Sequence, residues 1–201
     1  MKSWMTALAA ALLLCGAAQA APEHLVVPPY PGPPAWKLLT DKVGPQGFYH
    51  EHIPVGQTGD DFTDILTDQD FPNLASYDPA AYLRTVFGGI PNACSGVRVS
   101  GPTPMTEGGF RVVYGQVYCG QQNGKPFGVD IFYKVISGDD ALYVVSREFH
   151  VPPSANGALL SFPPGQAARA AALLKAQSIG DAYLAKQVYL CGGRSTDARC
   201  K

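Results

Sequence analysis

The stretch from residue 97 to residue 149 alternates apolar-rich runs with turn sequences, and this pattern constrains the fold more than any other feature of the chain. Asn123-Gly124 is a strong signal for a short hairpin, and Gly138-Asp139 marks a second turn. Consecutive strands joined by tight turns predict a central antiparallel sheet. The expected strands cover residues 97–100, 110–119, 127–136 and 141–149.

The second turn also predicts a register between the last two strands. A two-residue turn at Gly138-Asp139 pairs Ser137 with Asp140 and places Asp130 opposite Arg147. Opposite charges that meet across a ladder favour this register, so we expect an Asp130–Arg147 pair on the less buried face. The other face is apolar and suited to packing against helices, with Val129, Ile131, Tyr133, Val135, Leu142 and Val144.

Helices are expected before and after this region. Asp78-Pro79 combines an N-cap residue with proline at the first helical position, and Gly88-Gly89 ends the helix. A second helical stretch is expected from near Gln166 to about Leu190, either continuous or split in two around residues 178–181. The apolar residues that could cover the sheet are Leu173, Leu174, Ile179, Leu184 and Val188.

Two further strands are expected ahead of the first helix, over residues 47–55 and 63–67. The fold class that follows is α+β, with a central antiparallel β-sheet covered by helices.

The first twenty residues predict a cleavable signal peptide, with Lys2 as a short basic region and Ala18-Gln19-Ala20 as the cleavage site. The apolar run between them is about ten residues long, and spanning a bilayer takes about twenty. Lipidation at Cys15 is the alternative, and Leu14 is bulky for that processing site. We expect a periplasmic or secreted protein with no integral membrane segment after cleavage.

The rest of the chain divides in two. Residues 21–35 are proline-rich and are expected to form an extended tether outside the core. Residues 36–201 are expected to form a single α+β domain. Without Lys2 the chain has 14 basic and 16 acidic residues and a net charge of −2. This balance gives no electrostatic reason to expect nucleic acid or anionic lipid as a partner.

Four cysteines remain after the signal peptide, and an even number in an exported chain predicts disulfide bonds. Three connectivities are possible. We favour Cys94–Cys119 and Cys191–Cys200, because the second pair closes a short loop through Gly192-Gly193. A zinc site built from all four is the alternative, but the sequence contains no C-x-x-C pair.

The chain resembles a group of uncharacterised exported bacterial proteins that are similar to the PsbP/DcrB-like α/β/α sandwich. The residues that carry the resemblance lie in 52–69, in 78–83 leading to Cys94, and in Cys119 with 124–126 and 133–145. Phe62 stands where the pattern would have tryptophan. The resemblance implies the sandwich fold and a cysteine pair, and it implies an accessory or binding role more than a catalytic one.

Three histidines could bind a metal. His50 and His52 are two residues apart on an expected strand and therefore share a face, and His150 ends the last strand. If the strands are neighbours, the three imidazoles could hold Zn²⁺ or Cu²⁺; otherwise they are surface histidines that never meet. The acidic run does not match a calcium loop and is interpreted as a solvated face; it contains Asp60, Asp61, Asp64, Asp68 and Asp70.

No catalytic motif is recognised. Ser95 lacks the G-x-S-x-G context, and paired cysteines cannot act as nucleophiles. Aromatic residues could line a groove between sheet and helix and mark a binding site: Tyr30, Trp36, Phe48, Tyr49, Tyr114, Tyr118 and Tyr143. The sequence therefore predicts an exported, non-enzymatic binding or accessory protein for an envelope protein or small ligand, without a cofactor. The alternative is a periplasmic metal-binding protein that uses His50, His52 and His150.

Overall fold

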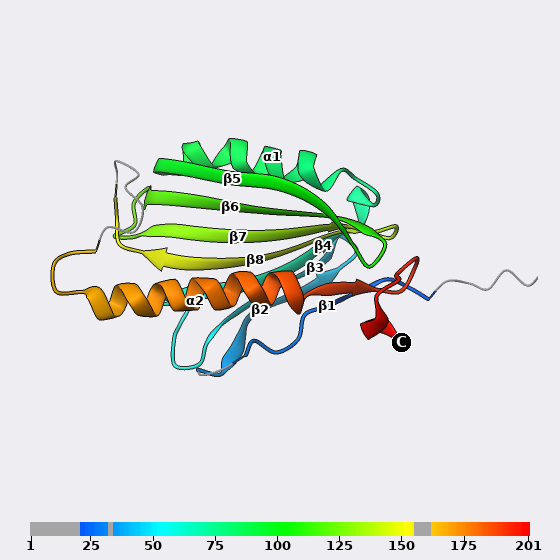
Figure 1. Ribbon diagram of the computed structural model, residues 1–201, viewed down its shortest axis with the longest axis horizontal. Helices are drawn as coiled ribbons and strands as arrows, with labels where there is room; N and C mark the ends of the chain where they lie inside the picture. The colour runs from blue at the N-terminus through cyan, green and yellow to red at the C-terminus, as the bar shows by residue number, and fades with distance from the viewer. Residues whose placement is uncertain (1–20, 32–33, 155–161) are drawn as a thin grey trace, which may run out of the picture.

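The computed structural model describes residues 21–31, 34–154 and 162–201. The expected signal peptide and Cys15 lie outside the described residues. In the described part, the main element is a seven-stranded antiparallel sheet with the strand order β2-β3-β4-β8-β7-β6-β5 (Figure 1). Its strands are β2 (Trp36–Gly44), β3 (Gly47–Pro54), β4 (Asp64–Phe71), β5 (Cys94–Glu107), β6 (Phe110–Gln122), β7 (Gly128–Ser137) and β8 (Leu142–Val151).

Two α-helices cover opposite faces of this sheet. Helix α1 (Pro79–Gly89) packs Leu83 against Val144, and helix α2 (Ala167–Lys186) packs Leu184 against Val145. Because Val144 and Val145 are successive residues of β8, their side chains point to opposite faces. Asp78 caps α1 as expected, and its carboxylate accepts a hydrogen bond from the N–H of Ala80 at 3.0 Å. The described residues thus form an α+β fold with one helix on each face, and the short 3₁₀ turns are η1 (Pro72–Leu74), η2 (Ile90–Asn92) and η3 (Ala198–Cys200).

Strand β5 is much longer than the four residues expected for it. Pro102 and Pro104 argue against a strand, since proline cannot donate a ladder hydrogen bond. β5 lies at the edge of the sheet, where only one side of the backbone is paired, so both prolines are tolerated. A register shift between Ser100 and Thr103 accommodates Gly101, which has a φ of +87°.

The register predicted for β7 and β8 is wrong by two residues. Ser137 pairs with Leu142 and Asp130 with Phe149, because the turn spans residues 138–141. A shift of two residues keeps every side chain on its predicted face but changes its neighbours. The predicted Asp130–Arg147 pair therefore does not form, and both side chains are buried.

Each of these two residues has another partner. Arg147 Nη2 lies 2.9 Å from Asp64 Oδ2 on β4. Asp130 accepts hydrogen bonds from the side-chain amides of Gln116 at 2.8 Å and Gln177 at 2.9 Å. The face expected to be less buried is therefore the one that α2 covers.

Helix α2 is continuous through residues 178–181. Gly180 lies against β8, where an added Cβ would come within 2.8 Å of Phe149 Cζ. Leu184 is buried as expected, and Val188 beyond the helix is buried too, but Leu174 and Ile179 are exposed. The helix thus faces the sheet through Gly180, Tyr183 and Leu184 rather than through a leucine stripe.

The proline-rich segment is not a free tether. Strand β1 (His24–Val26) pairs with β9 (Tyr189–Cys191), and Leu25 packs against the core. The Glu23 carboxylate accepts hydrogen bonds from the N–H groups of Asp139 and Asp140, each at 2.9 Å. Beyond β1 the segment attaches through side chains and the Pro28 carbonyl, which accepts from the Tyr183 hydroxyl. Attachment of this kind needs no backbone N–H, so the prolines do not prevent it.

Two disulfides are formed, with the favoured connectivity. Cys94–Cys119 joins β5 to β6, and Cys191–Cys200 joins β9 to η3. β1 and the C-terminus lie at the same end of the molecule (Figure 1). Among the described residues, no helix combines the length and apolar character needed to cross a membrane.

Candidate functional site

A cavity of about 530 Å³ lies where the segment after β1 crosses the α2 face of the sheet. We call it the Trp36 cavity. Most of its walls are apolar or aromatic, and His52 is its one imidazole. Its lining consists of Val27, Pro28, Pro29, Tyr30, Ala35, Trp36, His52 and Leu66.

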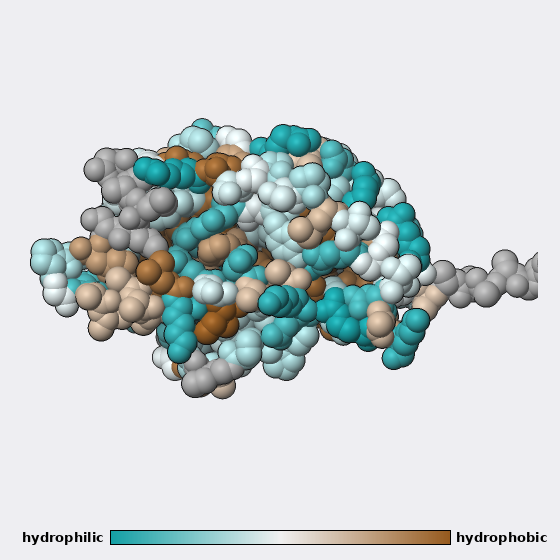
Figure 2. All heavy atoms as spheres, in the orientation of Figure 1, coloured by the Kyte–Doolittle hydropathy of each residue, from teal (hydrophilic) through white to brown (hydrophobic). Residues whose placement is uncertain are grey.

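The sheet brings the floor of this cavity together. Trp36 pairs with Pro54 and His52 pairs with Leu66, so strand alternation puts all four side chains on the α2 face. Helix α2 contacts β7 and β8 and leaves this part of the face to residues 27–30. Hydrophilic residues predominate on the side of the molecule that carries α2, with smaller hydrophobic areas between them (Figure 2).

An aromatic cluster stacked on a buried cation fixes one wall. The Tyr30 ring centroid lies 5.0 Å from that of Trp36 and 5.0 Å from that of Tyr183. The guanidinium carbon of Arg147 lies 4.2 Å from the Tyr30 centroid and 4.3 Å from the Trp36 centroid. Burial lowers the pKa of Arg147, while Tyr30 and Asp64 oppose that change. Stacking on a planar cation holds both rings in place.

A chain of polar side chains runs along the same face of the sheet from β2 to the cavity. Asp41 Oδ1 lies 3.4 Å from His50 Nε2, and His50 Nδ1 lies 2.8 Å from Asp68 Oδ2. The other oxygen of Asp68 lies 3.7 Å from His52 Nδ1. Burial lowers the pKa of His52, and the charge of Asp68 opposes this effect. His52 is the member of the chain that reaches the cavity.

The acidic run is not uniformly solvated, contrary to the sequence interpretation. Asp60 and Asp61 are exposed, but Asp68 is only 5% exposed. Asp64 and Asp68 are four residues apart on one strand, so both face the interior beneath α2. There they meet Arg147 and the two histidines, which explains how carboxylates are tolerated at buried positions.

The structure does not bring His150 together with His50 and His52. His52, Leu66 and Arg147 lie side by side across β3, β4 and β8 on one face. His150 is three residues after Arg147 and points to the opposite face. Its ring stacks on Phe127 with centroids 3.7 Å apart, and burial lowers its pKa to about 4. Within residues 21–31, 34–154 and 162–201, no group of three or more His, Cys, Asp or Glu side chains is arranged to hold a metal ion.

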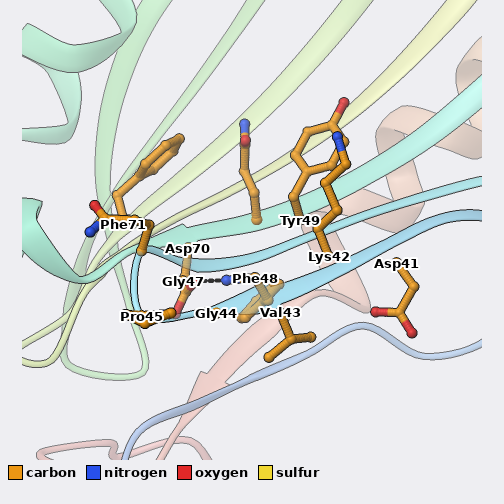
Figure 3. Close-up of a pocket in the computed structure, with 12 residues that line it drawn as sticks. Asp41, Lys42, Val43, Gly44, Pro45, Gly47, Phe48, Tyr49, Asp70 and Phe71 are labelled. Carbon is orange, nitrogen blue, oxygen red and sulfur yellow. Dashed lines mark hydrogen bonds between the residues drawn. The ribbon is translucent and has the colours of Figure 1, made fainter.

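A second cavity, of about 600 Å³, lies at the β2–β3 hairpin (Figure 3). The side chains of Lys42 and Tyr49 extend to one side of the strands, and those of Asp41 and Val43 extend to the other. The N–H of Phe48 donates to Asp70 Oδ1 at 2.5 Å, which ties the hairpin to β4. Its polar groups do not converge on one point, so it is the weaker candidate for a small ligand.

Two of the seven aromatic residues singled out in the sequence line the Trp36 cavity, namely Tyr30 and Trp36. Tyr118 and Tyr143 are buried, and Tyr114 donates a hydrogen bond to Glu107 at 2.8 Å. Sequence reasoning missed the wall formed by residues 27–29. The signal was present, since Leu25, Val26 and Val27 form an apolar run inside the proline-rich stretch.

No protein family and no curated protein matches this chain. Among solved structures, the chain is similar to LpqN, described as involved in cell envelope biogenesis of Mycobacterium tuberculosis. The identity is 18%, 87% of each chain is covered, and the TM-score is 0.40. A likeness at this level supports no conclusion about function. The PsbP/DcrB-like resemblance stays a prediction.

Proposed function

We propose that this protein is an extracytoplasmic, non-enzymatic binding protein that holds the apolar body of a small molecule in the Trp36 cavity. The observation that carries the proposal is the cavity itself, a volume of about 530 Å³ that is lined by aromatic and apolar residues and one imidazole. This volume and this lining are typical of small-molecule sites, which bury an apolar body and orient it with few polar groups.

The cysteines support a location outside the cytoplasm. All four cysteines after residue 20 are paired in the structure. Disulfides persist in oxidising compartments and are rare where thioredoxin and glutathione keep thiols reduced. Together with the expected signal peptide, this pairing favours the periplasm or the exterior of the cell.

The walls of the cavity are held in place before any ligand enters. Arg147 stacks on Tyr30 and Trp36, and the Tyr183 hydroxyl bonds to Pro28. A preformed site has less conformational entropy to lose on binding. A ligand of about ten non-hydrogen atoms is expected to bind with a Kd on the order of 100 µM.

Trp36 provides a direct readout of the cavity. The chain has two tryptophans, Trp4 and Trp36, and Trp4 lies in the expected signal peptide, so the protein without residues 1–20 keeps Trp36 as its single fluorophore of this kind. N-Phenyl-1-naphthylamine is uncharged, accepts energy from tryptophan and binds apolar cavities. We expect its emission, excited through Trp36, to rise and saturate as the probe fills the cavity.

Ala35 and Val55 offer a matched pair of variants. Both are exposed, and their backbones share a hydrogen bond at 2.7 Å, but only Ala35 lines the cavity. Ala35→Phe is expected to fill the cavity and abolish the saturable signal, and Val55→Phe to leave it intact. Equal signals from the two variants, at equal thermal stability, would show that the probe binds elsewhere and would reject the proposal.

A further inference from the structure

Asp68 and His52 each keep one buried polar atom without a hydrogen-bond partner, and these two atoms face each other. Asp68 Oδ1 and His52 Nδ1 lie 3.7 Å apart. This separation is too long for a hydrogen bond, but it is well within the range at which a charge acts on its neighbour in a buried site. Asp68 therefore influences the His52 ring through its charge.

That charge determines where a neutral His52 ring carries its proton. A carboxylate has only acceptor lone pairs. With its proton on Nε2, the ring would turn the Nδ1 lone pair toward Oδ1 and place two acceptors face to face away from water. With its proton on Nδ1, the ring turns an N–H dipole toward the carboxylate. The second arrangement is favoured, and it leaves Nε2 unprotonated.

The unprotonated nitrogen belongs to the part of the ring that is open to the cavity. The His52 side chain is 30% exposed and lines the cavity, while its Nδ1 is fully buried. The side chains around it are apolar or aromatic, apart from the hydroxyl of Tyr30. The Nε2 lone pair is thus an acceptor in a mostly apolar wall.

Charges around the cavity disfavour a charged ligand of either sign. The Arg147 guanidinium stacks behind Tyr30 and Trp36, which disfavours a cation. Asp64 and Asp68 lie beside the floor on the same face of the sheet, which disfavours an anion.

From this geometry we infer that Asp68 is a positioning residue that holds His52 with its Nε2 lone pair toward the cavity, and that the ligand carries an uncharged hydrogen-bond donor, such as a hydroxyl, on its apolar body. The inference about the ligand rests on the proposed function. The inference about the tautomer does not.

Protonation of His52 reverses the role of Nε2 from acceptor to donor. The titratable and charged groups around the ring come from every element that packs near it: His50, Asp41, Asp64, Asp68, Arg147, Tyr30 and Tyr183. At low pH a ligand oxygen can accept from protonated Nε2 whether or not it bears a proton itself. A hydroxyl ligand and its methyl ether should then bind alike.

The first test needs no ligand. Proton–nitrogen correlation spectra of the histidine rings, assigned with His52→Phe, are expected to show Nδ1 protonated and Nε2 unprotonated above the pKa of His52. Asp68→Asn is expected to abolish this preference. Asp41→Asn is the matched control, because Asp41 faces His50 and not His52, and it should leave the His52 signals unchanged. A wild-type ring protonated on Nε2 overturns the inference, even if Asp68→Asn fails to fold.

The second test uses cyclohexylbutanol and its methyl ether, which share one apolar body and are detected through Trp36 fluorescence. At neutral pH the alcohol is expected to bind about tenfold more tightly, because only it can donate to Nε2. The preference should vanish in His52→Phe and at a pH below the pKa of His52. Equal binding of both compounds at neutral pH overturns the donor requirement and leaves the cavity proposal standing. Failure of both to bind argues against the cavity as a site, and the ring spectra still decide the tautomer.

Discussion

The guanidinium carbon of Arg147 lies 4.3 Å from the ring centroid of Trp36, which joins the middle of the sheet to the wall of the cavity. Arg147 has no exposed surface, and its Nε and Nη1 atoms have no hydrogen-bond partner. The guanidinium is therefore stabilised mainly by contacts with aromatic rings, together with one ion pair to Asp64 at 2.9 Å.

Replacing a stacked arginine with lysine keeps the charge but loses the planar contact. We expect Arg147→Lys to lower the free energy of unfolding by about 2 kcal/mol and to shift the emission of Trp36. Chemical denaturation followed by Trp36 fluorescence measures both effects, and a variant equal to wild type in both would contradict the assigned role.

Asp130 makes stability depend on pH. Burial raises its pKa from 3.8 to about 6, and the hydrogen bond from Gln116 opposes that rise. Because the folded pKa is the higher one, the stabilisation is fully present below about pH 4 and is lost as pH rises through about 6. The loss corresponds to about 3 kcal/mol.

Asp130→Asn removes this titration and keeps an oxygen that accepts from Gln116 or Gln177. We expect the variant and the wild type to be equally stable near pH 4, and the variant to be more stable at pH 7. Glu148 contributes in the same direction, since burial raises its pKa to about 7, so the test compares the two proteins at each pH. A difference between the two proteins that does not change with pH would contradict this account.

Gly180 permits α2 to lie directly on β8. A Cβ there would come within 2.8 Å of Phe149 Cζ, and the clash is expected to outweigh the gain of about 1 kcal/mol in helix propensity. Gly88 is the control, because a Cβ on that residue of α1 meets no atom within 4 Å. We expect Gly180→Ala to lower the melting temperature and Gly88→Ala to raise it. A change in melting temperature with the same sign in both variants would mean that helix propensity, and not packing against β8, determines the effect of the substitution.

The two disulfides should contribute unequally to stability. They close loops with sequence separations of 25 and 9 residues. The chain-entropy relation gives about 3.5 kcal/mol for the longer loop and about 2.6 kcal/mol for the shorter one. Unfolding of Cys94→Ala/Cys119→Ala and of Cys191→Ala/Cys200→Ala measures the difference. A larger loss of unfolding free energy on removal of Cys191–Cys200 would indicate that this disulfide stabilises the fold by more than the lower chain entropy of the unfolded state.

Glu23 fastens the N-terminal segment to the turn between β7 and β8. Its carboxylate accepts from the N–H groups of Asp139 and Asp140, and its own N–H donates to Asp140 Oδ2 at 3.1 Å. Glu23→Ala is expected to cost about 1 kcal/mol. Hydrogen exchange at Asp139, Asp140 and β1 should become faster, while exchange in β6 stays unchanged. Unaltered exchange at the turn would show that the segment is held elsewhere.

Local signals in the sequence predicted much of the fold. The Asn123-Gly124 turn and the Asp78 cap depend on residues close in the chain. The cap is confirmed, and Asn123-Gly124 lies at the turn between β6 and β7, in a connection that covers residues 123–127. The length of the turn after Ser137 was not predictable in the same way. The N–H of Gly138 donates to Ala141 O, and the turn is held by Glu23, which is far away in the sequence. Tertiary contacts thus stabilise a turn of four residues instead of the predicted turn of two residues.

The candidate site was predicted only in part for a related reason. His50 and His52 share a face because they lie on one strand, and strand alternation alone predicts this. Whether His150 joins them depends on which residues of β3, β4 and β8 stand opposite one another, and a single sequence does not contain that register. Asp68 was missed as a partner of His52 for the same reason. Trp36 was identified as a candidate because of its residue type.

Binding of a small apolar ligand in the Trp36 cavity can be measured by calorimetric titration with cyclohexylbutanol at several temperatures. We expect saturable one-to-one binding with a negative heat-capacity change, which reports burial of apolar surface. Binding should be retained in Val55→Phe and lost in Ala35→Phe. Heats that do not saturate, or binding to Ala35→Phe that is as strong as binding to the wild type, would contradict the proposed function.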